Sequence, residues 1–247
     1  MKYQNKSTSN RFYRNHIRET SLQCFQVMIG ETDLCIYANR DLTNEAYERV
    51  IHCRNHLEAF IYQYPSFATT LTPWMSIQPA PEIVRRMIHA SQQSGVGPMA
   101  SVAGVIAEMV GTDLLQYSDE IIVENGGDLF IHKKQAFNVG VYAGTSPFSN
   151  RLGIHVDCAG ESLSICTSSS VIGHSLSFGK ADAVTIRSRS AALADAVATA
   201  AANRVKTKDD ISGAISFAKK IDGVDGVLIL IGKYMGAWGE LEIIPME

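Results

Sequence analysis

The sequence lacks a long apolar run, a strong net charge and a signal-peptide pattern. Its 22 Lys and Arg nearly balance 25 Asp and Glu, which leaves a net charge of −3. Bulk charge therefore provides little attraction for nucleic acid or an anionic membrane. No window is long and apolar enough to span a bilayer, and no apolar segment follows the basic N-terminal residues. These absences predict a cytoplasmic protein with no nucleic-acid or membrane partner.

Cysteine spacing and missing motifs exclude several further classes. The five cysteines are odd in number and form no CxxC pair, which argues against a zinc site or a disulfide framework and predicts reduced, mostly buried thiols. Neither GxxxxGK[ST] nor GxGxxG occurs, and there is no GxSxG elbow. A P-loop, a dinucleotide fingerprint and a typical serine hydrolase are thus disfavoured.

Strand and helix patterns alternate irregularly along the chain, which favours an α+β fold over strict βαβ alternation. Helices are expected at 42–62, with Thr43 as the N-cap, and at 82–92, 98–108, 191–203 and 208–219. Strands are expected at 12–18, 24–29, 34–38, 120–124, 129–132, 137–142, 152–156, 162–167 and 183–187. A closing pair of strands is expected at 227–231 and 240–244, joined by a Gly-rich link. Residues 1–10 are polar and expected to be disordered.

The run 193–203 is almost entirely small and apolar, and it contains one acid and one hydroxyl. Alanine is the best helix former, so Asp195 and Thr199 should lie one turn apart on the same helical face. Burying an Asp is costly unless its charge is compensated, and a hard cation such as Mg²⁺ accepts oxygen ligands. The alternative is an Asp near a helix start, favoured by the helix dipole, and a Thr that only packs.

Two glycine-containing segments could contribute to a site. Between Gly95 and Gly104, two glycines and Pro98 lead into a small-residue helix, and backbone amides at such a start can bind phosphate. For this segment alone, a simple helix entry with close helix packing is the better explanation of the same residues. The segment Asn125-Gly126-Gly127-Asp128 predicts a tight hairpin turn that presents Asn125 and Asp128 at the ends of two strands.

A third segment, 166–182, combines hydroxyls with one His and one Lys. Thr167, Ser168 and its neighbouring serines could hydrogen-bond a phosphate or sugar, and His174 could stack on a ring or donate to a phosphate. Serine-rich loops are also common without any such role.

Together these segments resemble the ApbE-like superfamily of flavin transferases. The family's Gly-Gly-Asp turn matches 126–128, its Thr-Ser loop matches 167–168, and its Ala-Asp-Ala-x-Ala-Thr-Ala helix matches 194–200 at every defined position. Residues 95–204 carry these motifs. The resemblance implies a single domain over 1–247, with two interlocked α/β lobes, mixed or antiparallel sheets and a nucleotide cleft between the lobes. It also implies FAD binding with Mg²⁺ on the pyrophosphate.

The resemblance also assigns residues to roles. It implies Asp195, Thr199 and the Ala103 carbonyl as metal ligands. Asp195 and His174 are the candidate catalytic residues. The candidate nucleotide-binding residues are Gly97, Met99, Ala100, Ser101, Asn125, Gly127, Asp128, Thr167, Ser168 and His174. The implied chemistry is Mg²⁺-assisted transfer of FMN from FAD to a threonine hydroxyl of an acceptor protein, with release of AMP. A homodimer is a further expectation.

The sequence departs from the transferase pattern at two places. The family carries Ala-Lys-Gly in the small-residue helix, where this chain has Ala103-Gly104-Val105, and its His-Ile-Ile-Asp-Pro loop is replaced by the shorter 178–182. These features look like a distinct branch of the superfamily. Metal and nucleotide binding are therefore better supported than transfer to a protein. Hydrolysis of FAD to FMN and AMP, non-catalytic nucleotide binding, and an unrelated small substrate in the same cleft remain alternatives.

Overall fold

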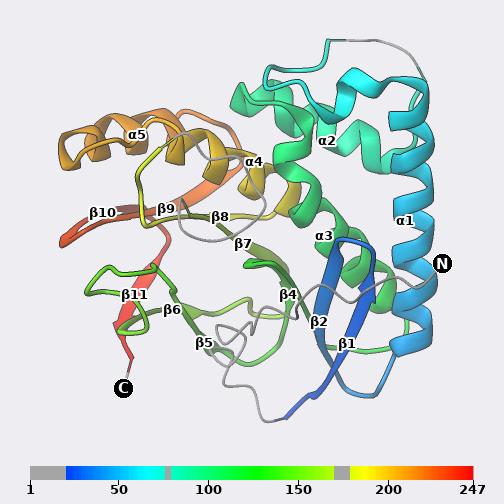
Figure 1. The fold of residues 1–247 in the computed structure, drawn as a ribbon. Coiled ribbons are helices and arrows are strands. Elements are labelled where there is room, and N and C mark those ends of the chain that lie inside the picture. The colour runs from blue at the N-terminus through cyan, green and yellow to red at the C-terminus, as the bar shows by residue number, and fades with distance from the viewer. Residues whose placement is uncertain (1–20, 76–78, 170–178, 247) are drawn as a thin grey trace.

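Two antiparallel sheets form the framework of the protein. The computed structural model describes residues 21–75, 79–169 and 179–246 (Figure 1). The larger sheet has eight strands in the order β1-β2-β3-β4-β7-β8-β9-β10, and the smaller sheet has the order β11-β6-β5. The strands are β1 Gln23–Ile29, β2 Thr32–Ala38, β3 Ile121–Asn125, β4 Asp128–His132, β5 Phe137–Gly140, β6 Leu152–Val156, β7 Ser162–Ser168, β8 Ala183–Ser188, β9 Val224–Ile231, β10 Tyr234–Gly239 and β11 Glu242–Pro245.

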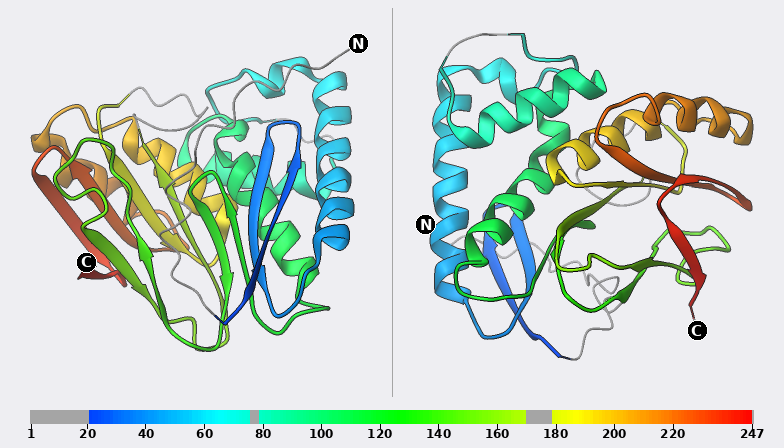
Figure 2. Two further views of the ribbon diagram at one scale, coloured as in Figure 1. Left: turned by 60° about the horizontal axis from the view of Figure 1, so that its bottom comes forward. Right: turned by 180° about the vertical axis from the view of Figure 1, so that it is seen from behind.

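Helices cover one face of the large sheet, and the small sheet covers the other (Figure 2). The helices are α1 Thr43–Gln63, α2 Glu82–Ser94, α3 Val102–Leu114, α4 Ala191–Ala202 and α5 Ile211–Ala218, with short 3₁₀ turns η2 Pro65–Ala68, η3 Pro98–Ser101 and η4 Lys208–Asp210. α3 packs on β3 and β4, and α4 packs on β7 and β8. The expected α+β class is therefore confirmed.

The central strands bury both of their faces, which explains why their sequences are continuously apolar. In β3, Ile121 and Val123 belong to the core under α1, α2 and α3, whereas Ile122 faces the small sheet. β4 follows the same rule, with Phe130 on the helical side and Ile131 on the other. Successive side chains point to opposite faces of a strand, so one sheet supports two separate cores.

The prediction that the strands at 227–231 and 240–244 pair with each other is wrong. β9 pairs with β10, which is the segment interpreted as a Gly-rich link, and β11 leaves the large sheet to pair with β6. The glycines of β10 serve close packing instead of a turn. A Cβ on Gly236 would lie 2.3 Å from Cγ2 of Ile211 in α5, and one on Gly239 would lie 2.1 Å from the Asp225 carbonyl oxygen.

Two smaller expectations also need correction. Thr43 is the first residue of α1, and the N-cap is Leu42 without a side-chain cap; Asp41 Oδ1 accepts from the Thr43 amide at 2.9 Å. The expected helix over 208–219 is divided into η4 and α5, because Thr207 and Asp210 form a capping box around η4. The strand expected at 12–18 and the polar segment 1–10 lie outside the described residues.

Within the described ranges, no single helix has the length and apolar composition needed to cross a membrane. Among the described helices, one pair, Glu82–Ser94 with Pro98–Leu114, meets that criterion when joined, and it is bent by 104°.

Gly104 allows α3 and α4 to cross at close range. A Cβ at this position would lie 2.3 Å from the Ala191 carbonyl oxygen and 2.9 Å from the Asp195 Cβ. Backbone cannot yield as a flexible side chain can, so Gly104→Ala should lower the free energy of unfolding by about 3 kcal/mol. Gly213→Ala in α5 is the matched control, because no atom lies within 4 Å of its Cβ position. It should leave stability unchanged or raise it by about 0.5–1 kcal/mol. Urea denaturation of both variants checks this, and equal stabilities would contradict the close-packing role of Gly104.

Candidate functional site

The candidate site lies where α3, α4, the β3–β4 turn and the end of β7 meet. α4 is buried along its whole length, because its alanines allow the sheet and its neighbouring helices to approach from every side. Within this apolar helix Asp195 is 7% exposed and Thr199 is 5% exposed. A carboxylate and a hydroxyl thus lie one helical turn apart inside the protein.

Two carboxylates connect α3 to α4. The Gly104 amide donates to Asp195 Oδ2 at 2.9 Å. One turn further along α3, Glu108 Oε2 accepts from the amides of Ala191 and Ala192 at 2.7 and 3.3 Å. Glu108 therefore satisfies the otherwise unpaired amides at the start of α4 and complements its dipole. Its other oxygen accepts from Arg86 Nη1 of α2 at 2.8 Å, so the Glu108 side chain connects α2, α3 and α4.

The β3–β4 turn carries polar groups to the start of α3. Gly126 and Gly127 have φ of 69° and 108°, the positive values that a tight hairpin between Asn125 and Asp128 requires. Asn125 Nδ2 donates to the Ala103 carbonyl at 3.0 Å, and the Gly127 amide donates to Glu124 Oε1 at 2.9 Å. The expected turn is confirmed, and it positions one of the proposed metal ligands.

Asp128 links the turn to β7. Its Oδ1 accepts from the Thr167 amide at 3.2 Å, and the Thr167 hydroxyl pairs with the Thr185 hydroxyl at 2.9 Å. The buried Cys166 thiol lies on the α4 side of β7, 3.5 Å from the Ala191 carbonyl oxygen. Asp128, Cys166 and Asp195 therefore form one buried group between the sheet and α4.

Burial changes the acid–base behaviour of this group. It raises the pKa of Asp195 to about 7, and hydrogen bonds from the Gly104 and Ala103 amides oppose part of that rise. Burial followed by the nearby charge of Asp195 raises the pKa of Asp128 well above its ordinary value. The Cys166 thiol also has a raised pKa, for the same first reason and because Asp128 is adjacent. Two buried carboxyls that repel each other need a cation or a proton.

The structure pairs neither Asp195 nor Asp128 with a Lys, Arg or His of the described part of the chain. Thr199 Oγ1 and Ser168 Oγ are both buried without a hydrogen-bond partner among those residues. An unsatisfied buried hydroxyl is costly. The oxygens of Asp195, Thr199 and Ala103 are the donor types that Mg²⁺ prefers, so the residues present fit that ion. In 21–75, 79–169 and 179–246, no cluster of three His, Cys, Asp or Glu side chains provides another arrangement for a metal.

The predicted nucleotide-binding residues divide into two sets. Asn125, Gly127, Asp128, Thr167 and Ser168 lie at or beside the buried group. η3 contains the remaining set, which packs against α4: Met99, Ala100 and Ser101, preceded by Gly97.

Packing alone explains the residues at the start of η3. A Cβ on Gly97 would lie 1.9 Å from the Thr70 carbonyl oxygen, and the Ser101 hydroxyl donates to the Pro98 carbonyl at 2.8 Å. The phosphate-binding role of this helix start stays a prediction. His174 lies outside the described residues.

Three neighbours of the site were not predicted from the sequence. Glu108 caps α4, Glu124 holds the Gly127 amide, and Cys166 lies against the buried carboxyls. The sequence does contain a signal for Glu108. Like Asp195, it is an acid in a helix of small apolar residues, where a buried carboxylate is costly without a partner. No pattern in the sequence distinguishes Glu124 or Cys166 from ordinary strand residues.

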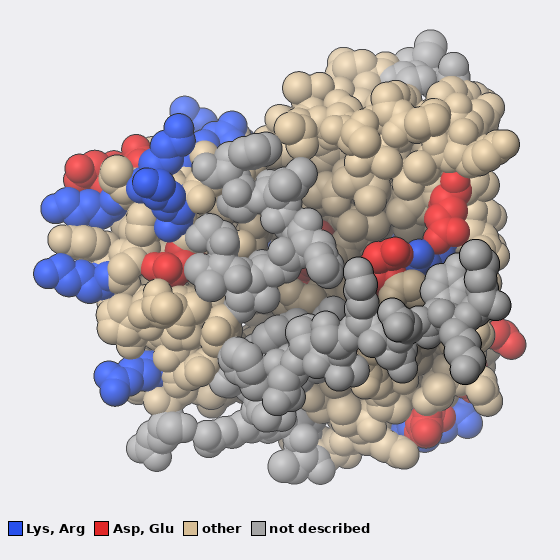
Figure 3. All heavy atoms as spheres, in the orientation of Figure 1, with Lys and Arg blue, Asp and Glu red and all other residues tan. Residues whose placement is uncertain are grey.

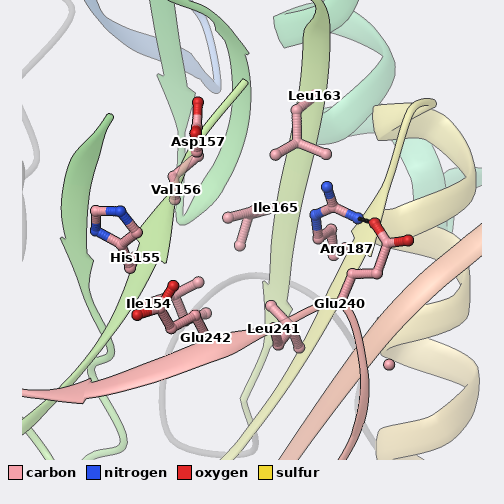
Figure 4. Close-up of a pocket in the computed structure, with 11 residues that line it drawn as sticks. Ile154, His155, Val156, Asp157, Leu163, Ile165, Arg187, Glu240, Leu241 and Glu242 are labelled. Atoms are coloured by element: carbon pink, nitrogen blue, oxygen red, sulfur yellow. Dashed lines mark hydrogen bonds and ion pairs between the residues drawn. The ribbon is translucent and has the colours of Figure 1, made fainter. Parts of the chain in front are cut away.

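A separate cavity lies on the opposite side of the large sheet (Figure 4). Its volume is about 360 Å³. Its lining mixes apolar side chains of β6 and β7 with His155, Asp157 and Glu242, and Arg187 forms an ion pair with Glu240 there. It includes none of the predicted site residues.

On the molecular surface, Lys and Arg gather on the side where α5 and β10 lie (Figure 3). Three lysines there stack on aromatic rings, with Lys208 and Lys233 over Tyr234 and Lys219 over Trp238.

Comparison with known proteins agrees with this architecture. The model of the family described as "AbpE bacteria" matches residues 14–222. The chain belongs to this family.

Curated relatives of this AbpE-family chain include proteins described as "UPF0280 protein" from two archaea. The protein of Methanococcus aeolicus is 37% identical over 152 residues, which are 60% of this chain and 61% of the relative. That of Methanothrix thermoacetophila is 42% identical over 130 residues, 52% and 54% of the two chains. The alignments thus span about three fifths or less of these relatives' length.

Solved structures share the fold at low sequence identity. The apo flavinyl transferase ApbE of Pseudomonas stutzeri superposes with a TM-score of 0.60 at 13% identity, covering 88% of this chain and 94% of that one. The flavin transferase ApbE of Vibrio cholerae gives 0.59 at 10% identity, covering 88% and 96%. The AbpE-family chain therefore has the ApbE fold, as its motifs predict.

The buried carboxyls should make stability depend on pH. In the unfolded chain Asp195 ionises near pH 3.8, and in the folded protein near 7, so between these values the folded state holds the extra proton. Without divalent cations the free energy of unfolding should therefore fall by about 3 kcal/mol as pH rises from 4 to 7. Asp195→Asn should make the fall shallower, and excess Mg²⁺ should do the same in the unmodified protein. Urea denaturation across this range in a chelator, then in Mg²⁺, measures it. A slope that neither change affects would contradict the assignment of the pH dependence to Asp195.

Proposed function

We propose that this protein binds a flavin nucleotide, FAD, together with Mg²⁺ at the junction of α3 and α4. The observation that carries the proposal is the buried Asp195 without a cationic partner in the described structure, one turn from an unpartnered Thr199 hydroxyl. The Ala103 carbonyl borders the same junction, and Asn125 holds it in place through a hydrogen bond. The ApbE fold of the relatives named as flavin transferases supports a flavin nucleotide as the ligand.

Asp195, Thr199 and the Ala103 carbonyl would hold the metal ion. Bound there, Mg²⁺ would neutralise negative charge on the pyrophosphate of the nucleotide. Ser168, whose buried hydroxyl has no partner in the described structure, would donate a hydrogen bond to a ligand oxygen. Asp128 would accept a hydrogen bond from a hydroxyl or amino group of the ligand.

The chain's own residues favour binding more than transfer. The position that matches the family's lysine is Gly104, which has no side chain and presents no amine to a ligand. This is the helix in which the transferases carry a lysine. Hydrolysis of FAD to FMN and AMP, and transfer of FMN to an acceptor protein, are therefore outcomes for the assay to decide.

Calorimetric titration of the protein with FAD, with and without Mg²⁺, tests the binding. Chromatography of the same mixture detects FMN and AMP, with and without threonine-containing acceptor peptides. Binding should require Mg²⁺. Appearance of both products would make the protein an enzyme, and binding without products would make it a binding module. If a folded sample binds neither FAD nor FMN nor an adenine nucleotide at millimolar concentration, the proposed function is wrong.

Thr199→Val isolates the hydroxyl, because valine keeps the shape of threonine. The substitution should weaken Mg²⁺-dependent FAD binding about tenfold, the value of one strong hydrogen bond or ligand contact, without lowering stability. Ser164→Ala is the matched control, since Ser164 Oγ is also buried and unpartnered but belongs to no predicted ligand set. Its affinity should equal that of the unmodified protein. Equal losses in both variants would show that the hydroxyl of Thr199 has no specific role.

A further inference from the structure

Two cysteines approach closely in the β1–β2 hairpin, at the edge of the large sheet. In the β1–β2 hairpin Cys24 lies opposite Tyr37, and Cys35 lies opposite Gln26. Because side chains alternate along a strand, both thiols and Tyr37 point to the same face. The two Sγ atoms are 3.2 Å apart. A disulfide bond is about 2.05 Å long, so the sulfurs need to approach by only about 1 Å to become bonded.

The two thiols differ in access. Cys24 is exposed, whereas Cys35 is 6% exposed beneath the hairpin. Among the described strands, β1 is the terminal strand of the sheet and is hydrogen-bonded to β2 alone. An end strand can shift by a fraction of an ångström without disturbing a second neighbour. A reagent can therefore reach Cys24 first, and Cys35 is positioned to react second.

Tyr37 supplies a donor beside both sulfurs. Burial raises the pKa of Tyr37 above its ordinary value, and the neighbouring Cys35 and Cys24 raise it further. The phenol thus stays protonated whenever a thiol ionises. A neutral hydroxyl that donates to a thiolate stabilises the nucleophilic form of cysteine.

The other cysteines lack this arrangement. Cys53 and Cys158 are buried, and burial raises the pKa of each thiol to about 11. Cys166 is fully buried behind the candidate site. Reactivity towards oxidants requires an accessible thiolate, so these three should remain reduced when the hairpin pair reacts.

We propose that Cys24 and Cys35 form a reversible disulfide by exchange with a small-molecule disulfide such as oxidised glutathione. The Cys24 thiolate attacks one glutathione sulfur, forms a mixed disulfide and releases one glutathione thiolate. The Cys35 thiolate then attacks Cys24 Sγ and releases the second glutathione. The two cysteines lose two electrons, the reagent gains them, and the two protons pass to the released thiolates. This chemistry is independent of whether the protein binds a flavin nucleotide.

Incubation of the reduced protein with oxidised glutathione, followed by acid quenching, alkylation and peptide mass spectrometry, tests the pairing. The expected product is a peptide pair joined through Cys24 and Cys35, two hydrogens lighter than the reduced pair, with Cys53, Cys158 and Cys166 alkylated after unfolding. Excess reduced glutathione should reverse it. An oxidised sample in which Cys24 carries one glutathione and Cys35 remains a thiol would overturn the proposal, as would a Cys24-linked dimer as the main product.

Three variants separate the steps. Cys35→Ser should stop at the mixed disulfide on Cys24, whereas Cys24→Ser should leave Cys35 unmodified. Tyr37→Phe removes only the hydroxyl and should slow formation of the internal disulfide about tenfold at neutral pH. Cys53→Ser is the matched control and should react like the unmodified protein. A Tyr37→Phe rate equal to that of the control would remove Tyr37 from the mechanism, and modification of Cys35 in Cys24→Ser would overturn the proposed order of attack.

Discussion

The contact between the Gly104 amide and the Asp195 carboxylate determines how the helical layer is built. It brings the backbone of α3 against α4 at a distance that only glycine permits at the crossing. Glu108 repeats the same kind of contact one turn later, at the amides that begin α4. Burying a carboxylate is costly, and here backbone donors of the neighbouring helix offset part of that cost. The helix alignment and the chemistry of the site thus depend on the same interactions.

The large sheet brings the remaining groups to this helical junction. β3 and β4 are buried on both faces, so their connecting turn is fixed by two cores at once. The turn can therefore hold Asn125 against Ala103 and Asp128 against the Thr167 amide, although the three segments are distant in sequence. A polar site assembled from one turn, one strand end and two helices is held rigidly by the apolar residues around it.

Sequence patterns predict the parts of this structure that local chemistry controls. The helix around Asp195, the Gly-Gly turn and most strands follow from alanine content, positive φ and apolar alternation, and the ApbE fold follows from three motifs in order. The patterns fail for β10 and β11, because Gly236 and Gly239 have the composition of a link and are required by contacts with Ile211 and Asp225. Glu124 and Cys166 were missed for the same reason, since their importance comes from tertiary neighbours. At Gly97 and Gly104, the glycines are explained by backbone contacts that no local pattern reveals.

The pairing of β11 with β6 in the small sheet has a consequence for the order of folding. β5 and β6 are adjacent in the chain, but their sheet gains its third strand only when Glu242–Pro245 pairs with β6. During synthesis on the ribosome the large sheet can assemble from β1 to β8 before that segment is made, while one edge of β6 remains unpaired. The last residues of the chain therefore complete the packing of its middle, and nascent chains lacking them present an unpaired strand edge for a chaperone to cover.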